Sequence, residues 1–117
     1  MNRHDLSIVI PAHNAARTLE ATIDSALGAD GLLEILVVDD GSTDETLELA
    51  VGLASALREA EQTRLRVLTQ AHAGPSAARN LGAASAQGDV LAFLDADDTW
   101  LARVPDPRRA ALAPGSA

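Results

Sequence analysis

The chain has 117 residues, a formal net charge of −8, no cysteine and no lysine. This length suits one domain with a hydrophobic core, and the absence of cysteine excludes disulfides and thiolate metal sites. The acidic balance argues against a broad basic surface for nucleic acid, and no apolar run reaches the 18 or so residues of a membrane span. Because the start of the chain has no signal-peptide pattern, we expect a cytoplasmic protein that can also associate peripherally with a membrane.

The first predicted unit is a strand followed by a helix. Residues 6–10 are rich in β-branched side chains and predict a buried strand, which Pro11 is expected to stop. Asn14 is a candidate helix cap, and apolar residues at a spacing of four predict a helix over residues 15–27. Gly28 then ends this helix.

The second unit repeats this order. An apolar strand is predicted over residues 34–38. Ser42 with Glu45 three residues later is typical of a capping box, so we expect a helix over residues 43–61.

The third unit leads into a fourth strand. Residues 65–69 form a less apolar strand, which favours a position near the sheet edge, and Pro75 suits the first turn of a helix over residues 76–86. Gly88 ends that helix, and the apolar run of residues 89–94 predicts the last strand.

Strands that alternate with helices predict an α/β fold with an open, mostly parallel sheet flanked by helices. In such sheets, ligands bind outside the carboxyl ends of the strands. Polar residues follow three of the four predicted strands, at 11–14, 39–42 and 95–98. We therefore expect these three segments to meet at one edge and form a binding site.

Two aspartates after the fourth strand are candidate metal ligands. If the strand continues, Asp95 and Asp97 point to the same face, about 6–7 Å apart. Oxygen ligands of this kind suit Mg²⁺ or Mn²⁺, which can hold a diphosphate. The structural alternative is a solvated acidic turn.

For the other polar residues near the predicted edge, the sequence allows more than one role. Asp39 and Asp40 alternate faces, so one can meet a ligand while the other caps or braces the next helix; both can also be capping acids. Arg79 can neutralise a phosphate, contact a base or pair with Asp95. His13 can contact a nucleobase or be an exposed loop histidine.

The glycine motifs of dinucleotide-binding folds and P-loops are missing, so phosphate charge must be met by metal, arginine or helix N-termini. The last residues differ in character: residues 1–98 hold 16 acidic residues and six arginines, whereas residues 99–117 hold one acidic residue and three arginines. We expect a domain over residues 1–100, a flexible tail over 101–117, and Trp100 as a packing anchor after the acidic turn.

With these motifs in place, the sequence resembles the nucleotide-binding half of family 2 glycosyltransferases, which have a GT-A fold. The resemblance rests on four segments in order, at residues 7–14, 35–44, 74–82 and 88–98. It implies transfer of a sugar from a nucleotide-diphospho-sugar, with a UDP-sugar as the expected donor.

The resemblance also implies roles for individual residues. Pro11, Ala12 and Asn14 would shape the nucleoside pocket. Asp40, or as the second choice Asp39, would bind the base, with Arg79 nearby. Asp95 would lie near the ribose or the metal, and Asp97 would ligate Mg²⁺ or Mn²⁺.

Family members continue well beyond this point with a half that holds the acceptor site and the acidic general base. The only acidic residue after Asp98 is Asp106, in a segment without matching context. We therefore expect no catalytic base in this chain, and a truncated enzyme with little or no activity alone. The alternative is a non-catalytic nucleotide-sugar-binding module that works with a partner chain, and an exposed sheet edge would also favour self-association.

Overall fold

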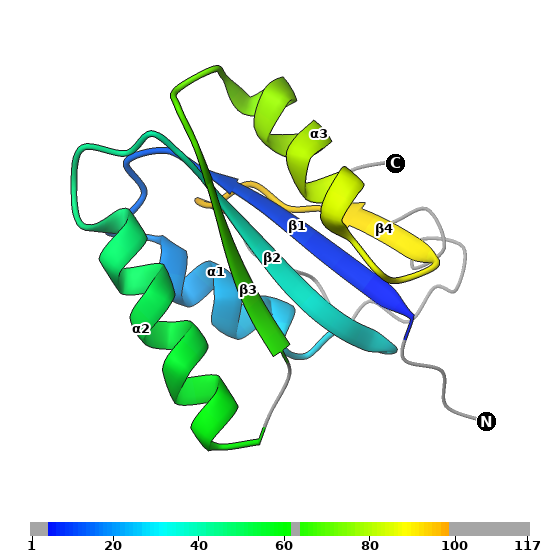
Figure 1. Cartoon of the computed structure of the whole chain (residues 1–117). Coiled ribbons are helices and arrows are strands. Elements are labelled where there is room, and N and C mark those ends of the chain that lie inside the picture. Colours follow the sequence, from blue (N-terminus) through cyan, green and yellow to red (C-terminus); the bar gives the residue numbers. More distant parts are fainter. Residues whose placement is uncertain (1–4, 62–63, 99–117) are drawn as a thin grey trace.

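The computed structural model describes residues 5–61 and 64–98, which form a four-stranded parallel sheet with three helices (Figure 1). The strand order is β3-β2-β1-β4. In chain order the elements are β1 (Leu6–Ala12), α1 (Leu19–Ala26), β2 (Leu32–Asp40), α2 (Thr46–Glu59), β3 (Arg64–Gln70), α3 (Pro75–Ser85) and β4 (Val90–Phe93). The predicted α/β fold is confirmed.

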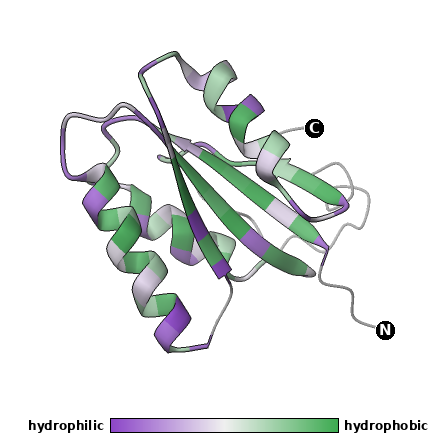
Figure 2. Cartoon of the chain, in the orientation of Figure 1, coloured by the Kyte–Doolittle hydropathy of each residue, from purple (hydrophilic) through white to green (hydrophobic). Residues whose placement is uncertain are grey.

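The sheet separates two hydrophobic layers. Alternate residues of β1 and β2, such as Ile8 and Val37, pack into a larger core on the side of α1 and α2. The residues between them, such as Val9 and Val38, pack into a smaller core with Ala78 of α3. The central strands are accordingly hydrophobic along most of their length (Figure 2). This alternation decides toward which helix layer each polar residue at the strand ends projects.

The edge position predicted for the third strand is confirmed, since β3 pairs only with β2 among the described strands. Within the same residues, no helix is long and apolar enough to cross a membrane. The predicted tail of residues 101–117 and the predicted anchor Trp100 lie outside the described residues.

Pro11 does not stop the first strand, so that expectation was wrong. β1 continues to Ala12, and Pro11 pairs with Val38 of β2. The carbonyl oxygen of Val9 accepts a hydrogen bond from the Leu94 amide, so the backbone of Val9 and of Pro11 faces the β4 side. The register between β1 and β4 ends at Val9, and a proline two residues later therefore removes no ladder hydrogen bond.

Both predicted helix starts after β1 and β2 were too early. α1 begins at Leu19, and Asn14 has a positive φ of 51° and does not cap it. α2 begins at Thr46, and Glu45 makes no side-chain cap bond, so the predicted capping box is absent. Both segments instead form loops whose polar groups bond to each other, which competes with helix formation.

The fourth strand is shorter than predicted, and it does not continue into the aspartates. β4 ends at Phe93, and the amide of Asp98 donates to the carbonyl of Asp95 at 3.0 Å, closing a turn. We call residues 95–98 the aspartate turn.

A polar network fixes the opposite, amino-terminal end of the sheet. The Glu34 side chain is completely buried and accepts hydrogen bonds from the Ser7 hydroxyl, the backbone amide of Gln87 and the Arg66 guanidinium. Burial raises the pKa of Glu34, but these bonds and the charge of Arg66 outweigh it and hold the pKa below its ordinary value. The network ties β1, β2, β3 and the segment after α3 together.

Candidate functional site

The carboxyl ends of β1 and β2 are joined by hydrogen bonds between their loops. The backbone amide of Asn14 donates to the Ser42 hydroxyl at 2.9 Å, and the backbone amide of Thr43 donates to Asn14 Oδ1 at 2.8 Å. The Ala15 amide donates to Thr46 Oγ1 at 2.8 Å. The first two bonds use Asn14 and Ser42, the side chains that the sequence suggested as helix caps, and the three together give the loops one defined shape.

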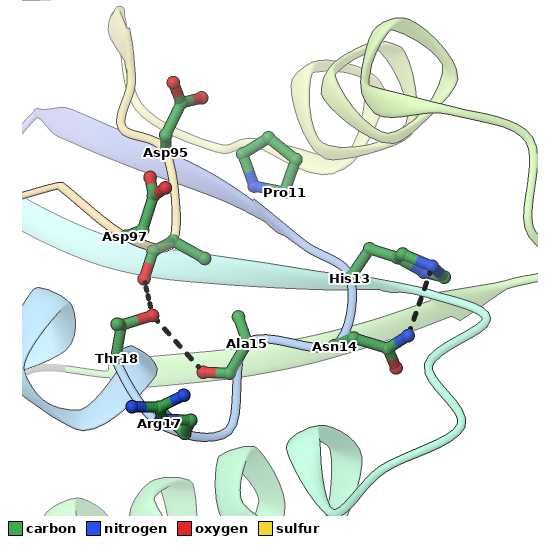
Figure 3. A pocket seen from close by; sticks show the side chains of 9 residues that line it. Pro11, His13, Asn14, Ala15, Arg17, Thr18, Asp95 and Asp97 are labelled. Carbon is green, nitrogen blue, oxygen red and sulfur yellow. Dashed lines mark hydrogen bonds between the residues drawn. The ribbon is translucent and has the colours of Figure 1, made fainter.

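A pocket of about 580 Å³ opens between the loop after β1 and the aspartate turn (Figure 3). Its wall includes the two candidate metal ligands on one side and the imidazole of His13 on the other. The lining residues are Pro11, His13, Asn14, Ala15, Arg17, Thr18, Asp95, Ala96 and Asp97. The expected meeting of the loop after β1 with the aspartate turn is therefore observed.

Two threonines of α1 and its cap hold the aspartate turn in place. The Thr18 hydroxyl donates to the Ala96 carbonyl at 2.8 Å (Figure 3). The buried Thr22 hydroxyl lies 2.8 Å from the same carbonyl and 2.7 Å from the carbonyl of Asp98. A hydroxyl has one hydrogen, so Thr22 donates to one of these carbonyls at a time. Asp95 and Asp97 thus project from a backbone that is tied to α1.

Asp40 braces the loop between β3 and α3. Its carboxylate accepts hydrogen bonds from Gln70 Nε2, the Ala73 amide and the Gly74 amide, at 2.8, 2.8 and 3.0 Å. Burial raises the pKa of Asp40, but these three bonds and the nearby His72 outweigh it and lower the pKa to about 2. The sequence suggested that one aspartate of the pair braces the helix after β2, whereas Asp40 braces the loop before α3.

Asp39 differs from Asp40 although the two are adjacent. It lies on the face of β2 that Val37 shares with α1 and α2, and it is 4% exposed. Its Oδ1 atom is buried and has no hydrogen-bond partner among the described residues. Asp39 therefore retains acceptor capacity that Asp40 has already used.

Arg79 of α3 forms the ion pair with Asp95 that the sequence suggested. The two side chains approach to 3.6 Å and are both more than one-third exposed, so the pair is weak and can open. Arg79 thus lies next to the aspartate turn.

The predicted site residues fall into three groups. Pro11, Asn14, Asp95 and Asp97 line one pocket. Arg79 contacts Asp95 from α3, and Asp40 lies beside His13, whose Nδ1 atom is 2.8 Å from the Asp40 carbonyl oxygen. Ala12 and Asp39 are buried opposite each other in the sheet and do not line this pocket.

Sequence reasoning did not select Arg17, Thr18 or His72. Arg17 is an exposed cation on the pocket wall, and only its position three residues after Asn14 hinted at this. His72 comes next to Asp40 because Gly41 has a positive φ of 67° and no Cβ, which would lie 2.7 Å from the His72 backbone nitrogen. No local pattern reveals a contact between residues 32 positions apart.

Comparison with known proteins places this geometry in a family. The family model for glycosyl transferase family 2 matches residues 7–104. An uncharacterised glycosyltransferase of Nostoc sp. strain PCC 7120 is 40% identical over 96 residues, which are 81% of this chain and 29% of that protein. The Escherichia coli UDP-Glc:alpha-D-GlcNAc-diphosphoundecaprenol beta-1,3-glucosyltransferase WfgD is 36% identical over 104 residues, which are 87% of this chain and 38% of that protein.

Solved structures show the same fold. The mannosyltransferase PcManGT from Pyrobaculum calidifontis, in complex with GDP-Man and Mn²⁺, matches with a TM-score of 0.76 and 26% identity over 88% of this chain and 30% of that chain. S. aureus TarS 1-349 in complex with UDP-GlcNAc matches with a TM-score of 0.73 and 25% identity over 92% of this chain and 31% of that chain. The sheet topology, the ordered motifs and these matches agree, and the chain belongs to glycosyl transferase family 2.

Proposed function

We propose that this chain binds a nucleotide-diphospho-sugar at the carboxyl edge of its sheet, as the donor-binding part of a glycosyltransferase. The observation that supports this most directly is the pocket between the loop after β1 and the aspartate turn, which Asp95 and Asp97 line together with His13 and Arg17 (Figure 3). PcManGT and TarS were solved with GDP-Man and UDP-GlcNAc, which is consistent with a sugar nucleotide as ligand here.

The residues of the aspartate turn fit a divalent metal ion. Asp95 and Asp97 are exposed on the pocket wall and offer only oxygen atoms, which suits Mg²⁺ or Mn²⁺. When bound, such an ion offsets the negative charge that develops on a departing nucleoside diphosphate. The threonine bonds to Ala96 hold the turn, so less ordering is required when the carboxylates bind a cation.

The remaining side chains suit the other parts of the donor. Arg17 supplies a positive charge on the pocket wall, where a phosphate can be neutralised without lysine. Arg79 can leave its weak pair with Asp95 and contact the nucleotide. We assign the nucleoside side of the pocket to Pro11, His13 and Asn14, with Asp39 or Asp40 as the base-binding aspartate and UDP as the expected nucleotide.

Sugar transfer needs more than the donor site. The chain covers 29% of its Nostoc relative and 38% of WfgD, and the family's acceptor site and general base are expected beyond the aspartate turn. We therefore propose donor binding for this chain, and transfer only together with an acceptor-binding half, in the same polypeptide or on a partner. β4 is an edge strand among the described strands, and self-association through it would appear as a dimer in size-exclusion chromatography.

Calorimetric titration with UDP in Mn²⁺, and then in EDTA, tests the proposal. We expect saturable binding that requires the metal, that Asp97→Ala abolishes, and that Asp24→Ala on the exposed face of α1 leaves unchanged. Both variants should keep the thermal unfolding midpoint, because both side chains are exposed. Metal-dependent UDP binding of unchanged affinity in Asp97→Ala would contradict the metal assignment.

A further inference from the structure

Two histidines and an aspartate from different loops meet beside the pocket. His13 follows β1, Asp40 ends β2 and His72 follows β3, and one ligand atom from each lies within 4.8 Å of the others. We propose that these three residues form a binding site for a divalent transition-metal ion such as Zn²⁺, separate from the oxygen-only site of the aspartate turn.

The contacts of each histidine with Asp40 are close to the spacing of donor atoms in a tetrahedral site. His13 Nδ1 is 2.8 Å from the Asp40 carbonyl oxygen, and His72 Nδ1 is 3.2 Å from that oxygen and 3.0 Å from Asp40 Oδ2. In a tetrahedral Zn²⁺ site with bonds of about 2.0–2.2 Å, neighbouring donor atoms are about 3.3–3.5 Å apart. The three ligand atoms lie within 4.8 Å of one another, so rotation of the two exposed rings brings both imidazoles and a carboxylate oxygen of Asp40 to one ion.

The hydrogen bonds define what the metal has to displace. A carbonyl oxygen only accepts, so the Nδ1 atom of each ring that contacts the Asp40 carbonyl carries a hydrogen. Metal binding uses the Nδ1 lone pair, so in each neutral ring this proton leaves Nδ1 for solvent and another is taken up at Nε2. The two imidazoles keep their charge, and no oxidant or reductant is needed.

The aspartate is held in place before any ion arrives. Gln70, Ala73 and Gly74 donate to its carboxylate, which fixes its orientation as outer-shell partners do in metal sites. Gly41 allows the backbone at His72 to approach this carboxylate. The central ligand and the backbone that presents the second imidazole are thus fixed, and only the two exposed rings have to adjust.

The two rings stack, with centroids 4.2 Å apart and planes inclined by 29°. The Nδ1 lone pairs lie in the ring planes, so both rings must tilt to reach one ion. Both rings are exposed, which leaves them free to turn. Zn²⁺ binding should therefore disrupt the stacking, and this change is visible in the imidazole signals.

Ligand chemistry separates this site from the aspartate turn, whereas His13 and Asp40 are shared with the nucleoside side of the proposed donor site. Two imidazoles with oxygen favour Zn²⁺, Ni²⁺ or Cu²⁺, whereas the carboxylates of the aspartate turn favour Mg²⁺ or Mn²⁺. Excess Mg²⁺ can therefore occupy the aspartate turn during a Zn²⁺ titration. The inference does not depend on nucleotide binding, and a chain that fails to bind UDP can still have this site.

The experiment is a Zn²⁺ titration of the full chain in millimolar Mg²⁺, by competition with a chromogenic chelator. The chain has three histidines, so His4→Gln is a matched control for His13→Gln and His72→Gln. We expect one Zn²⁺ per chain, at least tenfold weaker binding in either cluster variant, and unchanged binding in His4→Gln. Circular dichroism confirms that the variants fold.

Imidazole NMR spectra with and without Zn²⁺ provide the second measurement. Signals of two of the three histidines should shift, and His13→Gln and His72→Gln should each remove one of them. Zn²⁺ affinity that both cluster variants retain, or that His4→Gln reduces equally, would overturn the proposal. Shifts confined to His4 would do the same.

Discussion

Both ends of β2 hold buried carboxylates, but the hydrogen bonding of these carboxylates differs between the two ends. At the amino end, Glu34 receives bonds from a hydroxyl, an amide and a guanidinium. At the carboxyl end, the Asp40 carboxylate accepts bonds from the end of β3 and the loop after it, and the Oδ1 atom of its neighbour Asp39 has no partner among the described residues. The amino end therefore holds the sheet together, while the carboxyl end keeps acceptors and charge available for a ligand.

This difference follows from the parallel sheet. Loops at the carboxyl ends surround a pocket, and two of them are supported by side chains of neighbouring loops rather than by packing. A buried polar group without a partner costs free energy, so a protein retains it at a ligand site more readily than in its core. Four predictions test the comparison, in order of expected effect.

Removal of the Glu34 carboxylate should have the largest effect on stability. Glu34→Ala leaves the Ser7 hydroxyl and the Gln87 backbone amide without their acceptor and Arg66 with the Ser85 carbonyl alone, and we expect a loss of about 3 kcal/mol in the free energy of unfolding. Urea denaturation measures this. Glu59→Ala on the exposed end of α2 is the control and should change stability by less than about 0.5 kcal/mol. If Glu34→Ala lowers the free energy of unfolding by less than about 1 kcal/mol, the Glu34 network does not stabilise the amino-terminal end of the sheet.

Acid should weaken both ends of β2. Burial raises the pKa of Glu34 and of Asp40, but their hydrogen bonds outweigh it, so that both pKa values are lowered, that of Asp40 to about 2. A carboxyl group whose pKa is lowered by folding stabilises the folded state at any pH above its ordinary pKa. This stabilisation disappears as the pH falls through the lowered pKa of the folded state. We expect the urea midpoint to be constant above about pH 5 and to fall from about pH 4.5 toward pH 2. Asp40→Asn should make that fall shallower, and an equally steep fall would refute the role of Asp40.

Thr22 should act on metal binding through the aspartate turn. Thr22→Val keeps the shape but cannot donate to the Ala96 or Asp98 carbonyl, so Asp97 is held less firmly. We expect Mn²⁺ affinity, followed by electron paramagnetic resonance, to fall about tenfold, as for outer-shell changes at metal sites. Thr22→Ser retains the hydroxyl and should restore the affinity. Equal Mn²⁺ affinity in the valine and serine variants would exclude this positioning role.

Asp39 should contribute least to stability. Because its Oδ1 atom has no described partner, Asp39→Asn removes a buried charge without breaking a known bond, and the free energy of unfolding should stay equal or rise by up to about 1 kcal/mol. The matched change Glu34→Gln should destabilise the chain, because the amide cannot replace the charge that faces Arg66. If Asp39→Asn lowers the free energy of unfolding by more than about 1 kcal/mol, the carboxylates at both ends of β2 stabilise the fold. The proposed difference between the two ends is then wrong.

The order of strands and helices can be read from local patterns in the chain, and with it the edge at which the polar segments meet. Local hydrophobic patterns decide these features, and the carboxyl ends of parallel strands necessarily share one edge. Pro75 at the start of α3 and the less apolar edge strand β3 were predictable for the same reason. The motifs at 7–14, 35–44, 74–82 and 88–98 also sufficed to identify the family, which the comparison confirms.

Long-range contacts in the folded chain, in contrast, settle which side chains are hydrogen-bonded within the protein and which remain available to a ligand. The contacts of Asp40 with the 70–74 loop and of Thr22 with the aspartate turn span 30 to 76 residues, and no local pattern specifies them. The helix caps failed for the same reason: Asn14 and Ser42 bond to each other's loops instead of to a helix start. Side-chain pairing across loops depends on how the strands are placed side by side, which is settled only when the whole sheet forms.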